Sequence, residues 1–201
     1  MQHLNLNIKK GEIVSIVGAS GAGKSTLLQI LGTLTQSDKG RIEINKQAIH
    51  HLNAKNLSTF RNREIGFIFQ AHQLLPEFSA LENVCLPNWM LQGSKIDAEK
   101  HAKKILLELG LKNRLNHKPM ELSGGEQQRV AVARALINKP SVILADEPSG
   151  NLDTANAKKL HELFFELRER YNQTFVIVTH NPELAEMSDR ILEIKDGIMQ
   201  S

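Results

Sequence analysis

The sequence predicts an α/β protein with a mostly parallel β-sheet. The first observation is a set of short, almost uninterrupted apolar runs, which are typical of β-strands: "IVSIV" at 13–17, "SVILAD" at 141–146 and "TFVIVTH" at 174–180. The second is a helical pattern between the last two runs, with apolar side chains at Leu160, Leu163, Phe164 and Leu167. A strand, a helix and a strand in this order form a β-α-β unit, which implies parallel strands.

Length and composition limit the possible functions. With 201 residues the chain is long enough for one α/β domain with an inserted subdomain, and short for two independent enzymes. The 25 basic side chains are nearly balanced by 22 acidic ones, which argues against a nucleic-acid partner. A single cysteine, Cys85, excludes an internal disulfide, and no charged-then-apolar leader opens the chain, so we expect a reducing cytosol. The longest apolar runs are strand-sized, so any membrane role must come through a partner.

Residues 1–70 are expected to form the first part of the core. Leu4, Leu6 and Ile8 alternate with polar residues, and "KKGE" makes a turn before the run at 13–17, so we expect a β-hairpin. A helix follows, whose apolar face is formed by Leu27, Leu28, Leu31 and Leu34. Two more strands follow in this part, a short one at "RIEIN" (41–45) and another at "IGFIF" (65–69). The result is an antiparallel β subdomain at the N-terminal side of a parallel sheet.

Residues 71–129 differ in character and predict a helical insertion. They lack a strong strand pattern, and Asp97 is a plausible cap for a Lys-rich helix that ends at Gly110. Residues 130–201 then supply the second part of the core, including the β-α-β unit.

A glycine-rich stretch, "GASGAGKST" at 18–26, lies between the first apolar strand and the first helix. It matches the phosphate-loop motif G-x-x-x-x-G-K-[ST] in the context that the motif requires. Its glycines allow backbone N–H groups to turn towards phosphate oxygens, and the helix points its positive end at the same place. We expect Lys24 to lie at the β/γ position and the Ser25 hydroxyl to hold Mg²⁺. The expected binding residues are Gly18, Ser20, Gly21, Ala22, Gly23, Lys24, Ser25 and Thr26.

Two carboxylates, Asp146 and Glu147, end the apolar run at 141–146. In a parallel sheet ligands bind beyond the carboxyl ends of the strands, so both acids are expected beside the phosphate loop. Asp146 would support Mg²⁺, and Glu147 would polarise an attacking water as a general base.

Two further polar residues end strands of the same sheet. His180 follows the run at 174–180, and Gln70 follows "IGFIF". The geometry of a parallel sheet brings both to the edge that carries the acids, where the Gln70 amide could reach the metal or the water. Taken alone, His180 fits a capping or surface role, and Gln70 fits a polar residue that simply ends a strand.

The stretch "LSGGEQQRV" at 122–130 predicts a helix start with an anion site. Ser123 and Glu126 form a capping box, and Gly124 and Gly125 occupy the first turn, where N–H groups are left over. Such a helix end binds anions. Because the chain already has one phosphate loop, we expect this second site to serve the nucleotide of another molecule.

These motifs, together with "SGNLD" at 149–153, resemble the nucleotide-binding domain of ABC transporters over essentially the whole chain. The resemblance implies a P-loop NTPase core of the RecA-like kind with ATP and Mg²⁺ as cofactors. In that family two domains sandwich two ATP molecules head to tail. The resemblance further implies that Ser123 and Gly125 contact the γ-phosphate held by a second copy, that His180 touches the γ-phosphate, and that Asp153 lies in a loop that communicates across the interface.

Within that family, "QAHQLLPEFSALENVCLP" at 70–87 and the region around the LSGGE stretch most closely resemble the ATPases of lipoprotein-releasing systems, in a group that includes a macrolide exporter. The resemblance implies an ATP-hydrolysing homodimer under two permease subunits, at the cytoplasmic face of the inner membrane. The segment from His72 to Trp89 would receive the membrane subunit. Its apolar side chains fit that contact and packing inside the helical subdomain equally well.

Three other ATPase classes are alternatives. The first is the ATPase of a macrolide exporter of the same group. A regulatory ATPase resembling FtsE would signal through a membrane protein without moving a substrate. A DNA ATPase of the SMC kind would place hundreds of coiled-coil residues between loop and signature, whereas Lys24 and Ser123 are about one hundred residues apart here. A GTPase is not expected, because neither "NKQA" at 45–48 nor "NKPS" at 138–141 supplies the guanine-binding N-K-x-D.

The sequence departs from the family at the adenine site. Family members usually carry further N-terminal residues with an aromatic side chain that stacks on adenine, and no Phe, Tyr or Trp precedes Ile13 here. Either the chain is shortened, its start is misassigned, or the base is held by other residues.

Overall fold

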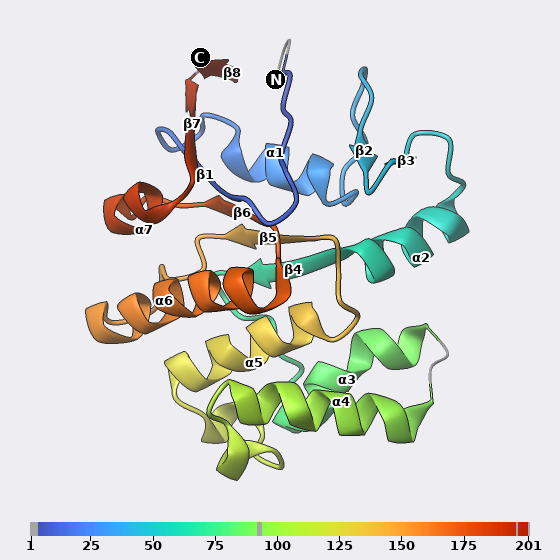
Figure 1. Ribbon diagram of the computed structural model, residues 1–201, viewed down its shortest axis with the longest axis vertical. Coiled ribbons are helices and arrows are strands. Elements are labelled where there is room, and N and C mark those ends of the chain that lie inside the picture. Colours follow the sequence, from blue (N-terminus) through green and yellow to red (C-terminus); the bar gives the residue numbers. More distant parts are fainter. Residues whose placement is uncertain (1–3, 92–93, 196, 201) are drawn as a thin grey trace.

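A six-stranded sheet in the order β4-β5-β6-β1-β7-β8 forms the centre of the molecule in the computed structural model, which describes residues 4–91, 94–195 and 197–200 (Figure 1). Its strands are β1 (Ile13–Val17), β4 (Ile65–Phe69), β5 (Val142–Asp146), β6 (Phe175–Val178), β7 (Arg190–Lys195) and β8 (Ile198–Gln200). Neighbouring strands pair in parallel except β7 and β8. The predicted α/β fold with a mostly parallel sheet is confirmed.

Helices cover both faces of this sheet (Figure 1). On one face lies α1 (Lys24–Leu31), and on the other lie α5 (Gly124–Leu136) and α6 (Thr154–Tyr171). Two further helices, α2 (Ala54–Glu64) and α7 (Pro182–Met187), flank the strands. No helix in the described part of the chain is both long and apolar enough to cross a membrane.

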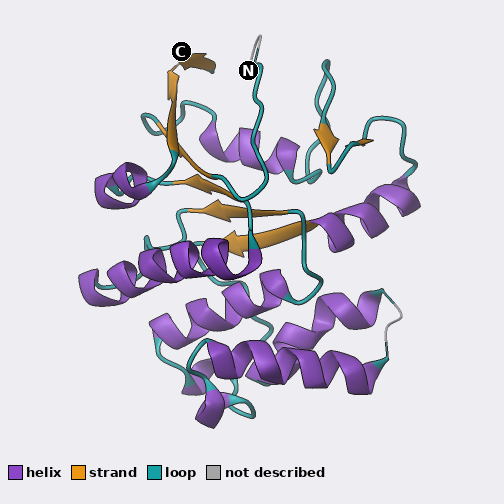
Figure 2. Cartoon of the chain, viewed as in Figure 1, coloured by secondary structure: helices purple, strands orange, loops and turns teal. Residues whose placement is uncertain are grey.

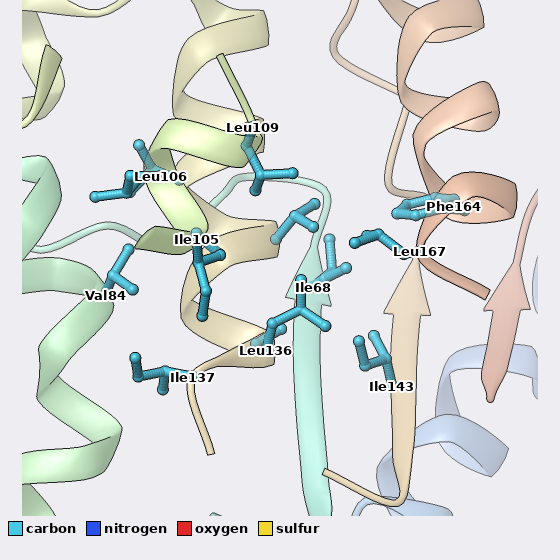
Figure 3. Close-up of a cluster of buried hydrophobic side chains, with 14 of the residues drawn as sticks. Ile68, Val84, Ile105, Leu106, Leu109, Leu136, Ile137, Ile143, Phe164 and Leu167 are labelled. Atoms are coloured by element: carbon cyan, nitrogen blue, oxygen red, sulfur yellow. The ribbon is translucent and has the colours of Figure 1, made fainter. Parts of the chain in front are cut away.

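The alternation of side chains along the strands divides the interior into two clusters. Ile143 and Ile177 face a cluster with α5 and α6, which we call the α5–α6 core, whereas Leu144 and Val176 face a cluster with α1, the α1 core. Figure 3 shows part of the α5–α6 core, with Leu136 beside Ile68. Burial on both faces explains why these strands read as continuous apolar runs.

A two-stranded antiparallel sheet, β2 (Glu43–Ile44) with β3 (Gln47–Ala48), lies near α1. Asn45 and Lys46 make the turn with positive φ values of 50° and 62°, as a two-residue hairpin requires. This is the antiparallel β element expected at the N-terminal side, although its first strand is shorter than "RIEIN".

The hairpin expected at the start of the chain is wrong. Residues 4–8 form no strand, and β1 already pairs with β6 on one side and with β7 on the other. Because both edges of β1 are occupied, no antiparallel neighbour fits beside it. Leu4 and Ile8 pack instead against the α1 core.

The segment between β4 and β5 contains α3 (Ala80–Met90), α4 (Lys95–Glu108) and two 3₁₀ turns, Lys112–Arg114 and Pro119–Glu121, before α5. Its described residues appear only as helix and loop in Figure 2. The expected cap Asp97 is wrong, because the Ser94 hydroxyl caps α4 and accepts the Asp97 N–H at 3.3 Å. Asp97 therefore lies in the first turn. The helix ends at Glu108, two residues before the expected end at Gly110, and Gly110 follows it with φ +75°.

Candidate functional site

The phosphate loop at residues 18–23 connects the carboxyl end of the central strand β1 to α1. Gly18 has φ +147°, and a Cβ there would lie 2.2 Å from the carbonyl oxygen of Ile194, so the loop needs glycine to pass β7. Gly23 precedes α1 in a left-handed conformation and leaves the helix without a side-chain cap. The N–H groups of the first turn are thus available to an anion.

Lys24 is buried, with 6% of its surface exposed, and its ammonium group crosses the loop. Its Nζ donates to the carbonyl oxygens of Gly18 at 2.8 Å and of Ala19 at 2.9 Å. The positive charge is therefore held inside the loop, where a phosphate would lie.

Ser25 and Asp146 come together from α1 and from the end of β5. The Ser25 hydroxyl donates to Oδ1 of Asp146 at 3.3 Å, although β6 separates β5 from β1 in the sheet. A hydroxyl and one carboxylate fit Mg²⁺, which commonly takes one or two carboxylates plus substrate phosphates and waters. The described residues hold no cluster of three His, Cys, Asp or Glu side chains that would form an all-protein metal cage.

Glu147 is held against the end of β6 by contacts with His180. Its backbone N–H donates to the carbonyl oxygen of Val178, and its Oε2 accepts the backbone N–H of His180 at 3.1 Å. Its Oε1 lies 3.2 Å from Nε2 of His180, but the two atoms do not have hydrogen-bonding geometry. Glu147 has φ +45°, an unusual left-handed conformation for this residue type. A carboxylate fixed in this way beside the phosphate loop is suited to accept a proton from water.

Gln70 is exposed directly after β4 and pairs with Asn151. Gln70 Nε2 donates to Asn151 Oδ1 at 3.1 Å, and Asn151 Nδ2 donates back to the Gln70 carbonyl oxygen at 3.0 Å. Gly150 closes the contact, because a Cβ there would lie 2.8 Å from Gln70 Nε2. The sequence reasoning missed Asn151, although its position between Glu147 and Asp153 in "EPSGNLD" marks it as part of the same loop.

The LSGGE stretch forms the capped start of α5 that its pattern predicts. Ser123 accepts the Glu126 N–H at 3.3 Å, and the Glu126 carboxylate accepts the Ser123 N–H at 2.8 Å. Arg114 donates from Nε to the same carboxylate at 2.8 Å. The Ser123 N–H bond, followed by Arg114, holds the pKa of Glu126 below its ordinary value.

Asp153 caps α6, and its hydrogen-bond partner Asn156 lies against the start of α5. Its carboxylate accepts the backbone and side-chain N–H groups of Asn156 at 2.9 Å and 2.5 Å, and these bonds lower its pKa. Gly125 faces the same asparagine, since a Cβ there would lie 2.8 Å from Asn156 Oδ1. The two loop segments thus form one packed unit.

One chain therefore carries two separate groups of candidate site residues, which we call half-sites. The phosphate loop, the acids, Gln70 and His180 gather beyond the carboxyl ends of the strands. The LSGGE stretch begins α5, on the sheet face opposite α1, and among the described residues no hydrogen bond or ion pair joins Ser123, Gly124 or Gly125 to residues 18–26 (Figure 1).

Comparisons with known proteins agree with one another. A family model described as ABC transporter matches residues 1–150. The lipoprotein-releasing system ATP-binding protein LolD of Cytophaga hutchinsonii is 58% identical over 99% of this chain and 91% of its own length. LolD of Bacteroides thetaiotaomicron is also 58% identical, over 100% of this chain and 92% of its own length.

Two solved structures extend the comparison. A dimeric ATP-binding cassette in a post-hydrolysis state, bound to ADP and Pi, is 42% identical with a TM-score of 0.87, over 98% of this chain and 88% of that one. The cbiO1 protein of Clostridium perfringens, part of the ABC transporter complex cbiONQ, is 28% identical with a TM-score of 0.88, over 98% of this chain and 79% of that one.

Proposed function

This chain belongs to the ABC transporter family, and from that membership we propose that it is the ATPase subunit of a transporter that releases lipoproteins from the inner membrane. Members of the family bind and hydrolyse ATP, and so does this chain. The cargo is inferred from relatives named for lipoprotein release, which match the chain over nearly its whole length.

Each candidate site residue would have a role in ATP hydrolysis. The loop from Gly18 to Thr26 holds the phosphates through backbone N–H groups, and Lys24 balances charge at the β/γ position. Glu147 accepts a proton from the water that attacks the γ-phosphorus, the bond to the β-phosphate oxygen breaks, and a general base of this kind contributes about 10² to 10⁴ in rate. Gln70 orients the water or the metal, and His180 contacts the γ-phosphate.

Magnesium belongs to the same proposal. Ser25 and Asp146 would hold it, supported by the 3.3 Å contact between the hydroxyl and Oδ1, and Gln70 would complete the set. Bound there, Mg²⁺ would neutralise charge on the β- and γ-phosphate oxygens.

We further propose that two copies of the chain share each ATP. The observation that carries this is the separation of the two half-sites within one chain, on helices that cover opposite sheet faces (Figure 1). A second copy in a head-to-tail arrangement would bring its Ser123, Gly124 and Gly125 to the γ-phosphate, with Asp153 at the interface. The dimeric cassette bound to ADP and Pi supports this arrangement.

The membrane side of the proposal rests on residues 71–129 as a helical subdomain inserted between core parts 1–70 and 130–201. Permease subunits would dock near His72 to Trp89, where Leu75 is exposed and Leu74 and Trp89 are half-buried. The chain would then lie peripherally at the cytoplasmic face of the inner membrane.

Glu147→Gln tests the shared site. The variant should bind ATP with Mg²⁺ but hydrolyse it at less than about a hundredth of the wild-type rate, because the amide cannot accept the proton. ATP-bound dimers should therefore accumulate and elute earlier in size-exclusion chromatography.

The control adds Ser123→Arg to the same variant. The second change leaves each phosphate loop intact but blocks the γ-phosphate of the other copy, so ATP should still bind while the dimer peak disappears. A Glu147→Gln protein that stays monomeric with saturating ATP and Mg²⁺ argues against two copies sharing the nucleotide.

A further inference from the structure

The last turn of α5 is tied to the loop that follows Gln70. Arg134 donates from Nη1 to the carbonyl oxygen of Gln73 at 2.5 Å and from Nη2 to that of His72 at 2.7 Å. Among the described residues, no carboxylate lies within ion-pair distance of this half-buried guanidinium. The planar guanidinium therefore donates its hydrogen bonds to two adjacent backbone carbonyls.

The loop that Arg134 holds is strained. His72 and Gln73 have φ values of 59° and 50°, in the left-handed region that non-glycine residues rarely adopt. Such conformations persist when the surroundings determine them. Arg134 bonds both strained residues, and the loop further on is held by the buried Asn83, whose side chain bonds both the N–H and the carbonyl of Leu75.

A second contact joins α5 to the strand before Gln70. Gly66 in β4 lets the helix backbone approach closely, because a Cβ there would lie 2.6 Å from the carbonyl oxygen of Ala135. Leu136 packs beside Ile68 in the α5–α6 core (Figure 3). The end of α5 is thus fixed to both sides of Gln70, through β4 before it and through His72 and Gln73 after it.

We propose that Arg134 is a positioning residue that makes α5 a rigid link between the two nucleotide sites of the sandwich. The inference rests on the proposed function, because it requires the N-terminal end of α5 to contact the ATP of the other copy. The helix has 13 residues, which is about 20 Å. A displacement of Ser123 by that ATP is transmitted along the helix to Arg134, which sets the loop and hence the Gln70 amide in its own site.

The test measures ATP hydrolysis against ATP concentration for the full chain and for Arg134→Met. The variant should lose about 10- to 100-fold in kcat, since misplaced positioning groups cost rates of this size. Its Hill coefficient should fall from the wild-type value towards 1, while ATP binding to the monomer changes by less than about twofold, because the phosphate loop is untouched. Arg134→Lys keeps the charge but not the fork, so both losses should be smaller.

Arg61→Met is the matched control. Arg61 also donates from Nη1 to the carbonyl of a residue with left-handed backbone, Thr33 with φ 59°, at 2.8 Å, but it joins α2 to the end of α1. Arg61→Met should lower Tm by about as much as Arg134→Met does, but it should leave the Hill coefficient unchanged. If Arg61→Met and Arg134→Met lose cooperativity equally, Arg134 has only a structural role.

Hydrogen exchange supplies a readout that does not depend on turnover. Amides of residues 71–73 should exchange faster in Arg134→Lys than in wild type, and in the Glu147→Gln background ATP should slow them only when Arg134 is present. If wild type and Arg134→Met hydrolyse ATP with the same Hill coefficient above 1, the inference about Arg134 is wrong while the proposed function stands. A wild type that neither dimerises nor hydrolyses ATP overturns the proposed function and the inference with it.

Discussion

At the residue scale, two neighbouring glutamines on α5 differ sharply in how their amides are satisfied. Gln127 donates from Nε2 to the carbonyl oxygens of Pro119 at 2.9 Å and Leu122 at 3.1 Å. Gln128 is fully buried, and neither side-chain polar atom has a partner among the described residues. Burial of an unpaired amide costs free energy, whereas a paired amide contributes to stability.

Replacing each glutamine by methionine should therefore have opposite effects. Gln128→Met removes the unpaired amide at similar volume and should raise the free energy of unfolding by about 1 kcal/mol. Gln127→Met breaks two bonds and should lower it by about 1 kcal/mol. Urea unfolding of both variants checks this, and a Gln128→Met protein less stable than Gln127→Met contradicts it.

The sequence predicts much of the local structure of the candidate site because the motifs that form it are contiguous. The phosphate loop, the acids at 146–147 and the capping box at 123–126 all follow from local patterns whose chemistry is tied to spacing. Contacts between distant residues were not predictable in this way. The approach of Gly18 to Ile194 and the bond between Gln70 and Asn151 exist only because strands far apart in sequence end at one edge.

At the element scale, capping boxes fix the residues at which two helices begin. The capping box of Ser123 and Glu126 begins α5, and a second box, formed by Ser79 and Glu82, begins α3. Hydrogen bonds from Ser79 also lower the pKa of Glu82. Both boxes tie helix stability to the charge of a carboxylate.

The box on α5 predicts a pH dependence. Because the folded pKa of Glu126 lies below the ordinary value of 4.5, its contribution is present above about pH 4.5 and is lost as pH falls through the folded pKa. Glu126→Gln should destabilise the chain by about 1 kcal/mol at pH 7, and the difference from wild type should shrink between pH 4.5 and 3. Urea unfolding across this range measures it.

Glu169→Gln serves as the comparison, because Glu169 is exposed on α6 and has no hydrogen bond among the described residues. Glu169→Gln should not change how the free energy of unfolding varies with pH in this range. A Glu126→Gln protein whose deficit stays constant down to pH 3 shows that the carboxylate charge does not stabilise α5.

Elements with strong periodicity were predicted, and weak or context-dependent ones were not. β4 and α5 begin where the sequence places them, and β5 begins one residue later. The helix α2 has only one buried residue, Phe60, so its apolar pattern is weak. The N-terminal hairpin failed because alternation specifies a half-buried strand but not whether the neighbouring edge is free.

At the scale of the whole molecule, the shared site couples stability to assembly. If two copies enclose two ATP molecules, ligand and partner both bind only the folded chain and shift its unfolding by mass action. Stability then depends on protein concentration as well as on ATP.

Thermal unfolding of Glu147→Gln with ATP and Mg²⁺ should show this dependence. ATP at about 100 times Kd stabilises by about 2.7 kcal/mol, and Tm should rise further with each increase in protein concentration. Without nucleotide, Tm should not depend on concentration. The double variant with Ser123→Arg should keep the rise caused by ATP and lose the dependence on concentration, and a concentration dependence that survives Ser123→Arg contradicts the prediction.

The position of β1 in the sheet also has a consequence for biosynthesis. Residues 13–17 are synthesised well before the strands that flank them, which lie at 175–178 and 190–195. This apolar segment therefore stays unpaired until residues 175–195 have been made, a situation in which long-range β pairing is slow and nascent chains aggregate. Synthesis of β7 thus completes the burial of β1, and the demand for chaperones during synthesis follows from this strand order.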